Sequence, residues 1–556
     1  MPTLEWIGKD KIVNHHMDVP FRVLERKYSF DEKGQHSEDN GSENMIIHGD
    51  NLDSLKALLP KYEGKIKCIY IDPPYNTGND IDNGGWIYSD NVNDPKIKKW
   101  LDEVVGKEGE DLSRHDKWLC MMYPRLKLLQ KLLADDGLIF ISIDDNEQAN
   151  LKIICDEILG KSNFLTQFTW RTDGNFDNQA KVKICHEYIL CYLKTPTLLG
   201  LPSGIDPSVS EGSKLFKPEI RNTLVKNGPK NPMSEIILPV GFPCAIDELT
   251  IFERKDSDFP YYHNTAYIKE KKLTNETVVE SGWQSKDLLL EYIKNNCNDI
   301  VDSKGQRTRF EISKTGAIEM IKVRNDPSHV ISVLSGLGST QNMGIELKKM
   351  GITFPYPKPT KLLEYILGFY LSDGSIVLDS FAGTGVTGHA VLNKNKTAGG
   401  QGKFRFILIE MMKYAESITA ERIKKVITGF DGSPGTGGSF SYYELGKPLL
   451  MPNGQLNEEI EEDKIREYIF YSETRTSMLP FVEQENKHFL GENNGVAYYF
   501  YYKKSQSTTL DHKFLSSIKT KSENYVIYAD INLLSDKEMK EHNITFKKIP
   551  RDIKAV

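Results

Sequence analysis

The sequence predicts an α/β protein with a parallel sheet that carries helices on its faces. The first observation is that apolar strand patterns alternate with helical patterns between residues 44 and 199. The second is that the same alternation returns between residues 351 and 430, after a long interruption. Parallel strands need a connection long enough to hold a helix, so this alternation is typical of parallel sheets. We therefore expect the two stretches to build one sheet.

Short apolar runs bounded by Gly, Asp or Asn mark the strands of the first half. Apolar residues at helical spacing mark the helices between them. The predicted strands are residues 44–48, 66–70, 138–144, 164–171 and 186–194, and the predicted helices are residues 52–59, 118–133 and 151–159.

The amino-acid composition of the chain changes between residues 200 and 350, where Pro, Gly, Asn and Ser become frequent. This change indicates an inserted domain. Beyond it, residues 361–367 predict a helix and residues 404–410 a strand. The expected segments are an N-terminal arm (1–43), the first half of the sheet (44–199), the insert (200–350), the second half (351–430) and a small α/β C-terminal domain (431–556).

Composition limits the class of protein. No apolar run approaches the roughly 18 residues of a membrane span. The N-terminus, MPTLEWIGKDKIVNHH, lacks an apolar signal core, and the seven cysteines include no C-x-x-C pair. We therefore expect a cytoplasmic protein with no membrane segment and no metal site. The net charge of −7 does not indicate nucleic-acid binding, but it does not exclude it, because a basic groove can lie on an acidic chain.

The segment IDPPYNTG, residues 71–78, ends a predicted strand with two prolines. Proline has no backbone donor, so the pair fixes a stiff, extended turn and leaves its carbonyls unpaired. The strand tip presents the Asp72 carboxylate, fixed acceptors and the flat ring of Tyr75. This set suits a flat ligand that carries an amino group. A proline-rich surface turn is the structural alternative.

A second motif, VLDSFAGTGVTG at residues 377–388, joins a strand to a helix. Its glycines match G-x-G-x-x-G, and Glu410 follows at the end of the next strand, near the spacing of a ribose-binding acid. Alone, this pattern is a weak signal for NAD. A hydride-transfer enzyme would leave Asp-Pro-Pro-Tyr without a role, whereas S-adenosyl-L-methionine gives both motifs one.

DPPYNTG followed much later by DSFAGTGVTG resembles the amino-methylating DNA methyltransferases of the β order, in which the catalytic motif precedes the cofactor motif. The chain is especially similar to the Mod subunits of type III restriction–modification systems, which are adenine-specific. Further blocks occur in family order: HGDN (48–51), PRLKLL (124–129), DDGLIFISIDDNE (135–147), HEYIL (186–190) and FPYPKPTKLL (354–363). The resemblance implies a Rossmann-like, S-adenosylmethionine-dependent methyltransferase sheet with an inserted target-recognition domain.

The resemblance implies a role for each catalytic residue. Asp72 and the carbonyl of Pro73 would accept the two hydrogens of the target amine. Pro74 would hold the turn rigid, and Tyr75 would stack on a base flipped out of the duplex. Two fixed acceptors favour the pyramidal amine, whose lone pair then points at the sulfonium methyl group. The methyl group would move directly, without a covalent enzyme intermediate.

The resemblance also implies a cofactor site. The implied residues are Asp379, Phe381, Gly383 and Gly385 at the methionine portion, Glu410 at the ribose, Asp50 at the adenine edge, and Lys358 and Thr360 over the tail. Two of these have structural alternatives. Phe381 could be plain core, and Asp50 could cap the helix at residues 52–59.

Several functions stay open at this point. Asp at the first motif position resembles the adenine methylators, whereas the cytosine amino-methylators more often have Ser there. Cytosine amino-methylation and RNA adenine methylation remain alternatives. A specificity subunit that only delivers a nuclease to DNA is another, although the intact motifs argue against it.

The insert separates the two halves of the sheet, so we expect it to rise above the catalytic face and read double-stranded DNA. Its candidate contacts are Tyr261, Tyr262, Trp283, Arg307 and Arg309. No G-x-x-x-x-G-K-[ST] motif occurs, so restriction would need a separate Res chain. The resemblance also implies a homodimer.

Overall fold

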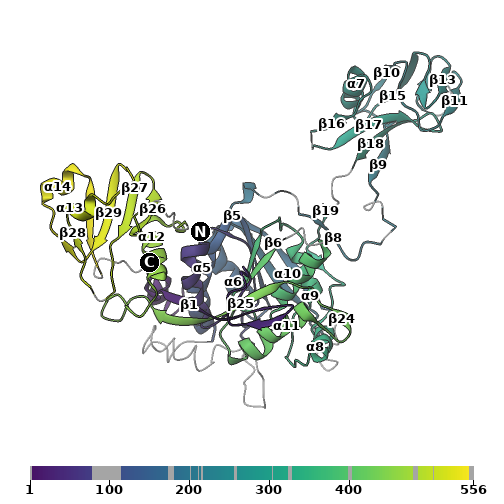
Figure 1. Cartoon of the computed structure of the whole chain (residues 1–556). Helices are drawn as coiled ribbons and strands as arrows, with labels where there is room; N and C mark the ends of the chain where they lie inside the picture. Colours follow the sequence, from purple (N-terminus) through teal and green to yellow (C-terminus); the bar gives the residue numbers. More distant parts are fainter. Residues whose placement is uncertain are drawn as a thin grey trace. The chain divides into compact units, whose positions relative to one another are not determined.

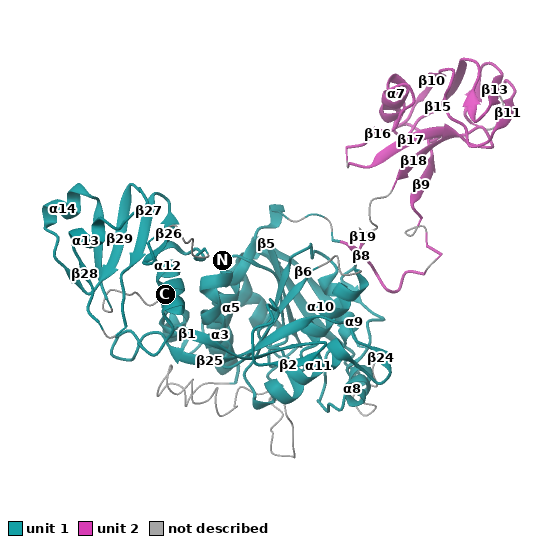
Figure 2. Cartoon of the chain, viewed as in Figure 1, with its two compact units in different colours: residues 1–202, 331–556 teal, residues 203–330 magenta. Residues whose placement is uncertain are grey.

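The computed structural model divides the chain into two compact units, Met1–Pro202 with Ile331–Val556, and Ser203–Val330 (Figure 2). It describes residues 3–77, 114–172, 181–198, 200, 202–210, 212–213, 217–255, 259–303, 305–323, 328–398, 403–479, 486–504 and 506–549. Residues 331–350, expected in the insert, belong to the first unit, as does the C-terminal region. Within the described ranges, no helix is both long and apolar enough to cross a membrane.

An 11-stranded sheet organises the first unit, in the order β2-β1-β25-β3-β22-β21-β4-β5-β7-β6-β20 (Figure 1). Its strands are β1 (Arg22–Asp31), β2 (Gly34–His36), β3 (Met45–His48), β4 (Ile66–Ile71), β5 (Leu133–Ile143), β6 (Phe164–Arg171), β7 (His186–Leu193), β20 (Val333–Leu334), β21 (Ile376–Asp379), β22 (Arg405–Glu410) and β25 (Ser439–Pro448). The strands of the second predicted half, β22 and β21, therefore lie between β3 and β4 of the first half in a single sheet.

Helices cover this sheet because its central strands are apolar on both faces. In β4, Ile69 and Tyr70 point to opposite faces, and both are fully buried. Ile69 shares a hydrophobic core with α3 and α5, while α10 contacts α9, β21 and β22. The helices are α1 (Lys9–Ile12), α2 (His15–Asp18), α3 (Asn51–Tyr62), α5 (Arg114–Leu132), α6 (Gln148–Cys155), α8 (Thr340–Lys349), α9 (Thr360–Leu367), α10 (Val386–Thr397) and α11 (Glu421–Thr428).

Among the strands that the sequence predicts, β7 departs from the expected parallel arrangement. β7 runs antiparallel to both β5 and β6, because β6 and β7 follow each other without a helical pattern between them. Tyr188, near the start of β7, pairs with Ile143 at the end of β5. The first residues of β7 consequently lie at the same edge of the sheet as the carboxyl ends of the parallel strands.

The terminal segments extend the first unit. β1 of the expected N-terminal arm pairs with β25, so the arm is part of the sheet. The C-terminal region adds a 4-stranded sheet in the order β26-β27-β29-β31. Its elements are α12 (Glu462–Thr474), β26 (Phe489–Asn493), β27 (Val496–Phe500), β28 (Thr509–Leu510), α13 (His512–Leu515), β29 (Asn524–Ala529), β30 (Ile531–Asn532), α14 (Asp536–Glu541) and β31 (Ile544–Lys548).

The second unit is built from short antiparallel strands around its own hydrophobic core. β8 (Gly204–Ile205) pairs in parallel with β19 (Ser328–His329), which brings the two ends of this unit together. The remaining elements are β9 (Glu219–Thr223), β10 (Met233–Leu238), β11 (Glu248–Ile251), β12 (Tyr261–Tyr262), β13 (Ala266–Lys269), β14 (Lys272–Leu273), β15 (Thr277–Gly282), α7 (Lys286–Lys294), β16 (Ile300–Val301), β17 (Arg307–Ile312) and β18 (Ile318–Val323).

Candidate active site

The two sequence motifs meet at one edge of the central sheet. β4 and β21 are parallel neighbours, with Ile69 opposite Leu378, so the loops that follow these strands leave the sheet side by side. Such a crevice at the carboxyl ends of parallel strands is the usual ligand site of an open α/β sheet. Here it is a cavity of about 470 Å³, lined jointly by the DPPYNTG motif, the FPYPK segment and the DSFAGTG motif.

The two prolines of the DPPY motif have different surroundings. Asp72, Pro73 and Tyr75 line the cavity. The carbonyl of Pro74 instead accepts a hydrogen bond of 2.7 Å from Nε1 of the buried Trp118. Within the described part of the chain, no hydrogen bond to the Pro73 carbonyl is formed. The carbonyl of Pro73, and not that of Pro74, is therefore left for a ligand.

A lysine holds the carboxylate of Asp72. Nζ of Lys358 lies 3.1 Å from Oδ1 of Asp72 and 2.8 Å from Oε2 of Glu187. Burial raises the pKa of Asp72, the charge of Lys358 lowers it, and the charge of Glu187 raises it. Burial lowers the pKa of Lys358, but the two carboxylates outweigh burial and raise it above its usual value. The cavity wall thus contains a lysine that stays protonated between two acids.

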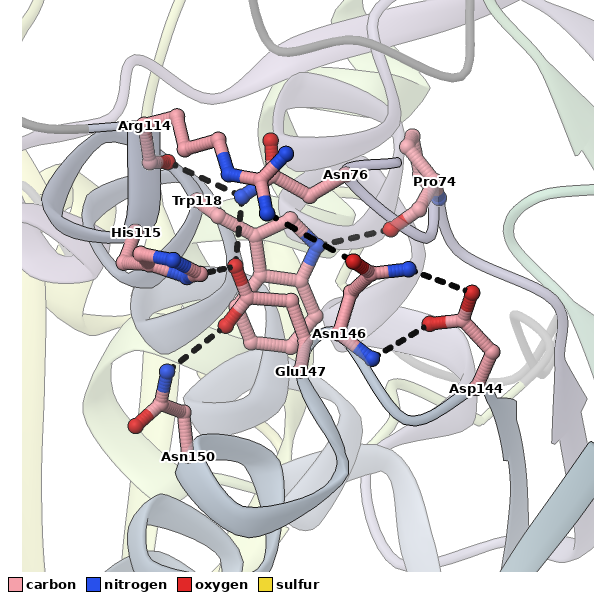
Figure 3. Close-up of polar contacts among 9 residues, drawn as sticks. All are labelled: Pro74, Asn76, Arg114, His115, Trp118, Asp144, Asn146, Glu147 and Asn150. Carbon is pink, nitrogen blue, oxygen red and sulfur yellow. Dashed lines mark hydrogen bonds and ion pairs between the residues drawn. The ribbon is translucent and has the colours of Figure 1, made fainter. Parts of the chain in front are cut away.

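A buried carboxylate binds Asn76 at the end of the DPPY loop (Figure 3). The side chain of Glu147 is fully buried and accepts a hydrogen bond of 2.5 Å from Nδ2 of Asn76 and one of 2.8 Å from Nδ2 of Asn150. Nδ1 of His115 lies 2.6 Å from the same carboxylate. Asn76 has a φ of 59°, a left-handed conformation that asparagine tolerates better than most residues. Gly78, the last residue of the motif, lies outside the described residues.

Two buried carboxylates support the glycine loop. Asp379, at the end of β21, accepts hydrogen bonds from the backbone N–H of Phe381 at 3.0 Å and from the Thr387 hydroxyl at 2.6 Å. Glu410, at the end of β22, accepts one from the backbone N–H of Gly383 at 2.8 Å. Burial raises the pKa of each carboxyl group to about 7. Across the described residues, no lysine or arginine forms an ion pair with either acid.

The predicted cofactor residues of this loop divide between the cavity and the helix behind it. Asp379, Phe381 and Gly383 line the cavity. Gly383 has a φ of 50°, and a Cβ added there would meet no atom closer than 4.0 Å, so its backbone borders open space. A Cβ at Gly385 would instead lie 3.2 Å from the carbonyl oxygen of Thr419. Gly385 therefore allows close packing of the helix and is not part of the wall.

Three other predicted cofactor residues have partners within the protein. Asp50 caps α3 by accepting a hydrogen bond of 2.8 Å from the backbone N–H of Leu52, which is the structural alternative given above. Thr360 is buried, and its hydroxyl accepts a hydrogen bond of 2.9 Å from Arg422. Lys358 lines the cavity, but it forms an ion pair with Asp72 of the DPPY motif.

The candidate DNA contacts of the second unit differ in exposure. Tyr262 and Trp283 are buried in the core of this unit, where the Tyr262 hydroxyl donates to the Gly316 carbonyl and Nε1 of Trp283 donates to the Ser234 carbonyl. Their rings are large and apolar, so packing accounts for them. The other three reach the surface: Tyr261 stacks on Phe259, Arg307 pairs with Asp299, and Arg309 pairs with Glu219.

Sequence reasoning missed two acids of the site. Glu187 lies in the cavity wall, and Glu147 lies beneath the catalytic loop. Glu187 belongs to the HEYIL block, and an antiparallel β7 would have placed the start of that block at the ligand edge of the sheet. For Glu147, the available signal was the run of acidic and amide residues, 144–147, that follows a strongly apolar strand.

Comparison with known proteins shows the family of the chain. Residues 66–421 match a family model described as DNA methylase, of the N6/N4 methyltransferase group. The chain belongs to this DNA methylase family. The matched range begins with β4 and contains both motifs, so most of the cavity lining lies in the part of the chain that the family shares.

Three relatives illustrate how much of the chain is shared. The Mod subunit of the type III restriction–modification enzyme EcoPI, from Escherichia phage P1, is 32% identical over 76% of this chain and 68% of its own length. The StyLTI Mod subunit from Salmonella typhimurium is 32% identical over 67% of this chain and 53% of its own length. The type II methyltransferase M.KpnI from Klebsiella pneumoniae is 28% identical over 68% of this chain and 83% of its own length. The chain thus spans about half to two thirds of these Mod subunits.

Proposed function

We propose that this methylase transfers the methyl group of S-adenosyl-L-methionine to the exocyclic amine of an adenine flipped out of double-stranded DNA. One observation carries the proposal. The acceptor groups of DPPY and the backbone of the glycine loop line one cavity. A ligand held by the first set lies next to a ligand held by the second, as a direct transfer between two bound molecules requires.

The acceptor side prepares the amine as a nucleophile. An aromatic amine is unreactive because its lone pair is shared with the ring. Asp72 and the Pro73 carbonyl accept its two N–H groups and favour the pyramidal form, whose lone pair is free to attack. Tyr75 supplies a flat surface for the flipped base. The new N–C bond forms as the sulfonium S–C bond breaks, and the amine then loses its extra proton.

The opposite wall suits the cofactor. S-adenosyl-L-methionine supplies the electrophilic methyl group when it is bound. Phe381 and the backbone of Gly383 border the cavity where the methionine portion would lie, and Asp379 offers a buried carboxylate to its positively charged groups. Glu410 would hold the ribose hydroxyls, as the carboxylate of the next strand does in other nucleoside sites. Thr360 and Gly385 would act by supporting this wall.

Adenine is the favoured base. The first residue of the motif is Asp72, which resembles the adenine methylators, and type III Mod subunits are among the relatives. Cytosine amino-methylation and methylation of RNA are the competing activities. Sequencing the modified bases in DNA from cells that express the chain would distinguish the two bases and would give the recognised site.

The second unit would serve as the target-recognition domain. Tyr261, Arg307 and Arg309 are its remaining predicted contacts, because they reach the surface. Contacts to phosphates would make DNA affinity fall steeply with salt. As a Mod-type subunit, the chain would form a homodimer and associate with a separate restriction chain. A solution mass of the monomer alone would contradict the first assembly.

The substitution Asp72→Ala tests the proposal. It should lower methyl incorporation into DNA by about 1000-fold or more, because one of the two amine acceptors is lost. Binding of S-adenosyl-L-methionine, measured by calorimetry, should persist. Asp373→Ala, at an exposed aspartate of a loop, is the matched control. Normal methylation by the Asp72→Ala variant would contradict the mechanism. A wild-type chain that binds DNA but transfers no methyl group without a partner would favour a non-catalytic specificity subunit.

A further inference from the structure

Two residues from distant parts of the chain close around the catalytic loop. Glu187 lies at the start of β7, and Lys358 lies between α8 and α9. Nζ of Lys358 donates a hydrogen bond of 2.7 Å to the Tyr75 hydroxyl, which donates one of 2.9 Å to Oε2 of Glu187. The same ammonium group lies 3.1 Å from Asp72 and 2.8 Å from Glu187. Every polar side chain of the DPPY motif is therefore tied to this pair.

The pair is built into the protein interior. The side chain of Lys358 is only 6% exposed, and those of Asp72 and Glu187 are 26% and 21% exposed. All three residues line the cavity, so part of this exposed surface faces the bound ligands. Burying an ammonium and two carboxylates is unfavourable unless each has partners of opposite charge. A cluster of this kind at the reaction centre therefore calls for a functional explanation.

We propose that Lys358 and Glu187 form a brace that positions the two working groups of the catalytic loop, the Asp72 carboxylate and the Tyr75 ring. The inference rests on the function proposed above and assigns two further residues to it. Lys358 holds Asp72 at one oxygen, so that the carboxylate keeps a fixed direction toward the amine. Glu187 and Lys358 together hold the Tyr75 hydroxyl, so that the ring is in place before the base arrives.

The brace reduces what the flipped base must organise. An extruded adenine gains nothing from acceptors that still have to find their positions, because ordering a side chain opposes binding entropically. A tethered Tyr75 offers its ring in one orientation, and an ion-paired Asp72 offers a charged acceptor. Both residues act through Asp72 and Tyr75, so Lys358 and Glu187 are positioning residues.

The two members of the brace act on Asp72 with opposite electrical sign. Lys358 lowers the pKa of Asp72, and Glu187 raises it. The other ionisable groups that face Asp72 are Tyr75, Tyr70 and Asp379, and the variants below leave all three in place. Asp72 accepts the amine hydrogen only as the carboxylate. Methylation should therefore have an acidic limb that moves with the charge of the brace.

The decisive experiment compares the pH profile of single-turnover methylation in two variants at saturating cofactor. Lys358→Met should move the acidic limb to higher pH, by about half a pH unit or more, and Glu187→Gln should move it to lower pH. Lys358→Arg keeps the charge and should largely retain the wild-type limb. A merely structural role would change rates without opposite shifts. Equal or same-direction shifts in the two variants would overturn the brace.

Tyr75→Phe separates the tether from the stacking surface. The ring remains, but its hydroxyl no longer binds Lys358 and Glu187. The rate of methyl transfer should fall about tenfold, while the affinity for S-adenosyl-L-methionine stays unchanged. A wild-type rate in this variant would show that the tether has no positioning role.

A final measurement does not depend on activity and so distinguishes failure of the brace from failure of the proposed function. A double-mutant cycle of thermal unfolding uses Asp72→Asn, Lys358→Met and the combined variant. The brace predicts that Lys358→Met destabilises the protein more when Asp72 is present than when it is replaced. Additive effects would overturn the ion pair, whether or not the wild-type chain methylates DNA.

Discussion

The buried acids at the DPPY motif and at the glycine loop have different kinds of partner. On the catalytic side, Asp72 has a lysine partner supplied by the protein itself. On the cofactor side, Asp379 and Glu410 receive hydrogen bonds from backbone N–H groups and a hydroxyl. None of the lysines and arginines in the described ranges pairs with these two acids. Burial accordingly raises their pKa values to about 7.

This difference indicates which groups the ligands must supply. In the proposed mechanism, the acceptor for a neutral amine has to be charged before the base arrives. Burial raises the pKa of Asp72 above its usual value, and the charge of Lys358 opposes this rise. Acids that bind a positively charged ligand need no lysine or arginine partner in the protein, because such a side chain would compete with the ligand. Asp379 and Glu410 therefore suit a cofactor that carries positive charge and hydroxyl groups, as S-adenosyl-L-methionine does. The following experiments would break or sharpen this contrast.

Among these experiments, the largest effect is expected from replacing Glu410, the acid that we propose holds the ribose. Glu410→Ala should weaken binding of S-adenosyl-L-methionine by about 100-fold, or about 2.8 kcal/mol, the scale of one or two charge-assisted hydrogen bonds. Isothermal titration calorimetry measures it, with Asp373→Ala as control. An unchanged affinity, together with a lower melting temperature, would mean that Glu410 only supports the backbone of Gly383.

Cofactor binding should also depend on pH in a way that DNA-side variants do not alter. Asp379 and Glu410, with pKa values of about 7, are largely protonated at pH 6. A positively charged ligand requires the ionised forms, so affinity should rise about tenfold from pH 6 to pH 8. Calorimetry across this range checks the slope. A flat profile would indicate that neither acid contacts the cofactor's charge.

In the ligand-free protein, the two carboxyl groups make folding stability fall as pH rises, which is opposite to their effect on cofactor affinity. Both carboxyl groups have folded-state pKa values above those of an unfolded chain. Their contribution to stability is fully present below about pH 4 and is lost as pH rises through about 7. The increase in melting temperature caused by the cofactor should consequently be larger at pH 8 than at pH 6.

A smaller effect is expected from the anchor beneath the catalytic loop. Glu147→Ala leaves the amide of Asn76 without its buried acceptor and should lower the rate of methyl transfer about tenfold through misplacement of the loop. Cofactor affinity should stay near the wild-type value, because Glu147 supports the other wall. Asn150→Ala removes a different partner of the same carboxylate and serves as the matched variant. A loss of cofactor binding equal to the loss of rate would argue against this division of labour.

Local sequence patterns predicted the strands and loops that carry the site. The partners of its side chains depend on tertiary contacts, which local patterns do not show. The apolar runs before Asp72 and Asp379 marked β4 and β21, and their motifs do share a cavity. The partner of Lys358 could not be read from its neighbours, because Asp72 and Glu187 reach it only through the folded sheet. Trp283 is of a residue type that can contact DNA. It is buried, however, by strands that are distant from it in the sequence.

The sequence left Asp50 between a helix cap and a cofactor contact, and a small effect can separate the two. The carboxylate accepts hydrogen bonds from the backbone N–H groups of Leu52 and Asp53, and it lies 3.5 Å from Arg125. Asp50→Ala should therefore lower the free energy of unfolding by about 1 kcal/mol, the usual effect of losing a cap. Asp50→Ser, which keeps a capping oxygen, should restore most of it. If Asp50 also binds the adenine edge, both variants weaken cofactor binding alike, because neither retains the carboxylate. If capping is its only role, calorimetry will give wild-type affinity for both variants. In that case, the acids that bind the cofactor are only those that have no lysine or arginine partner in the described part of the chain.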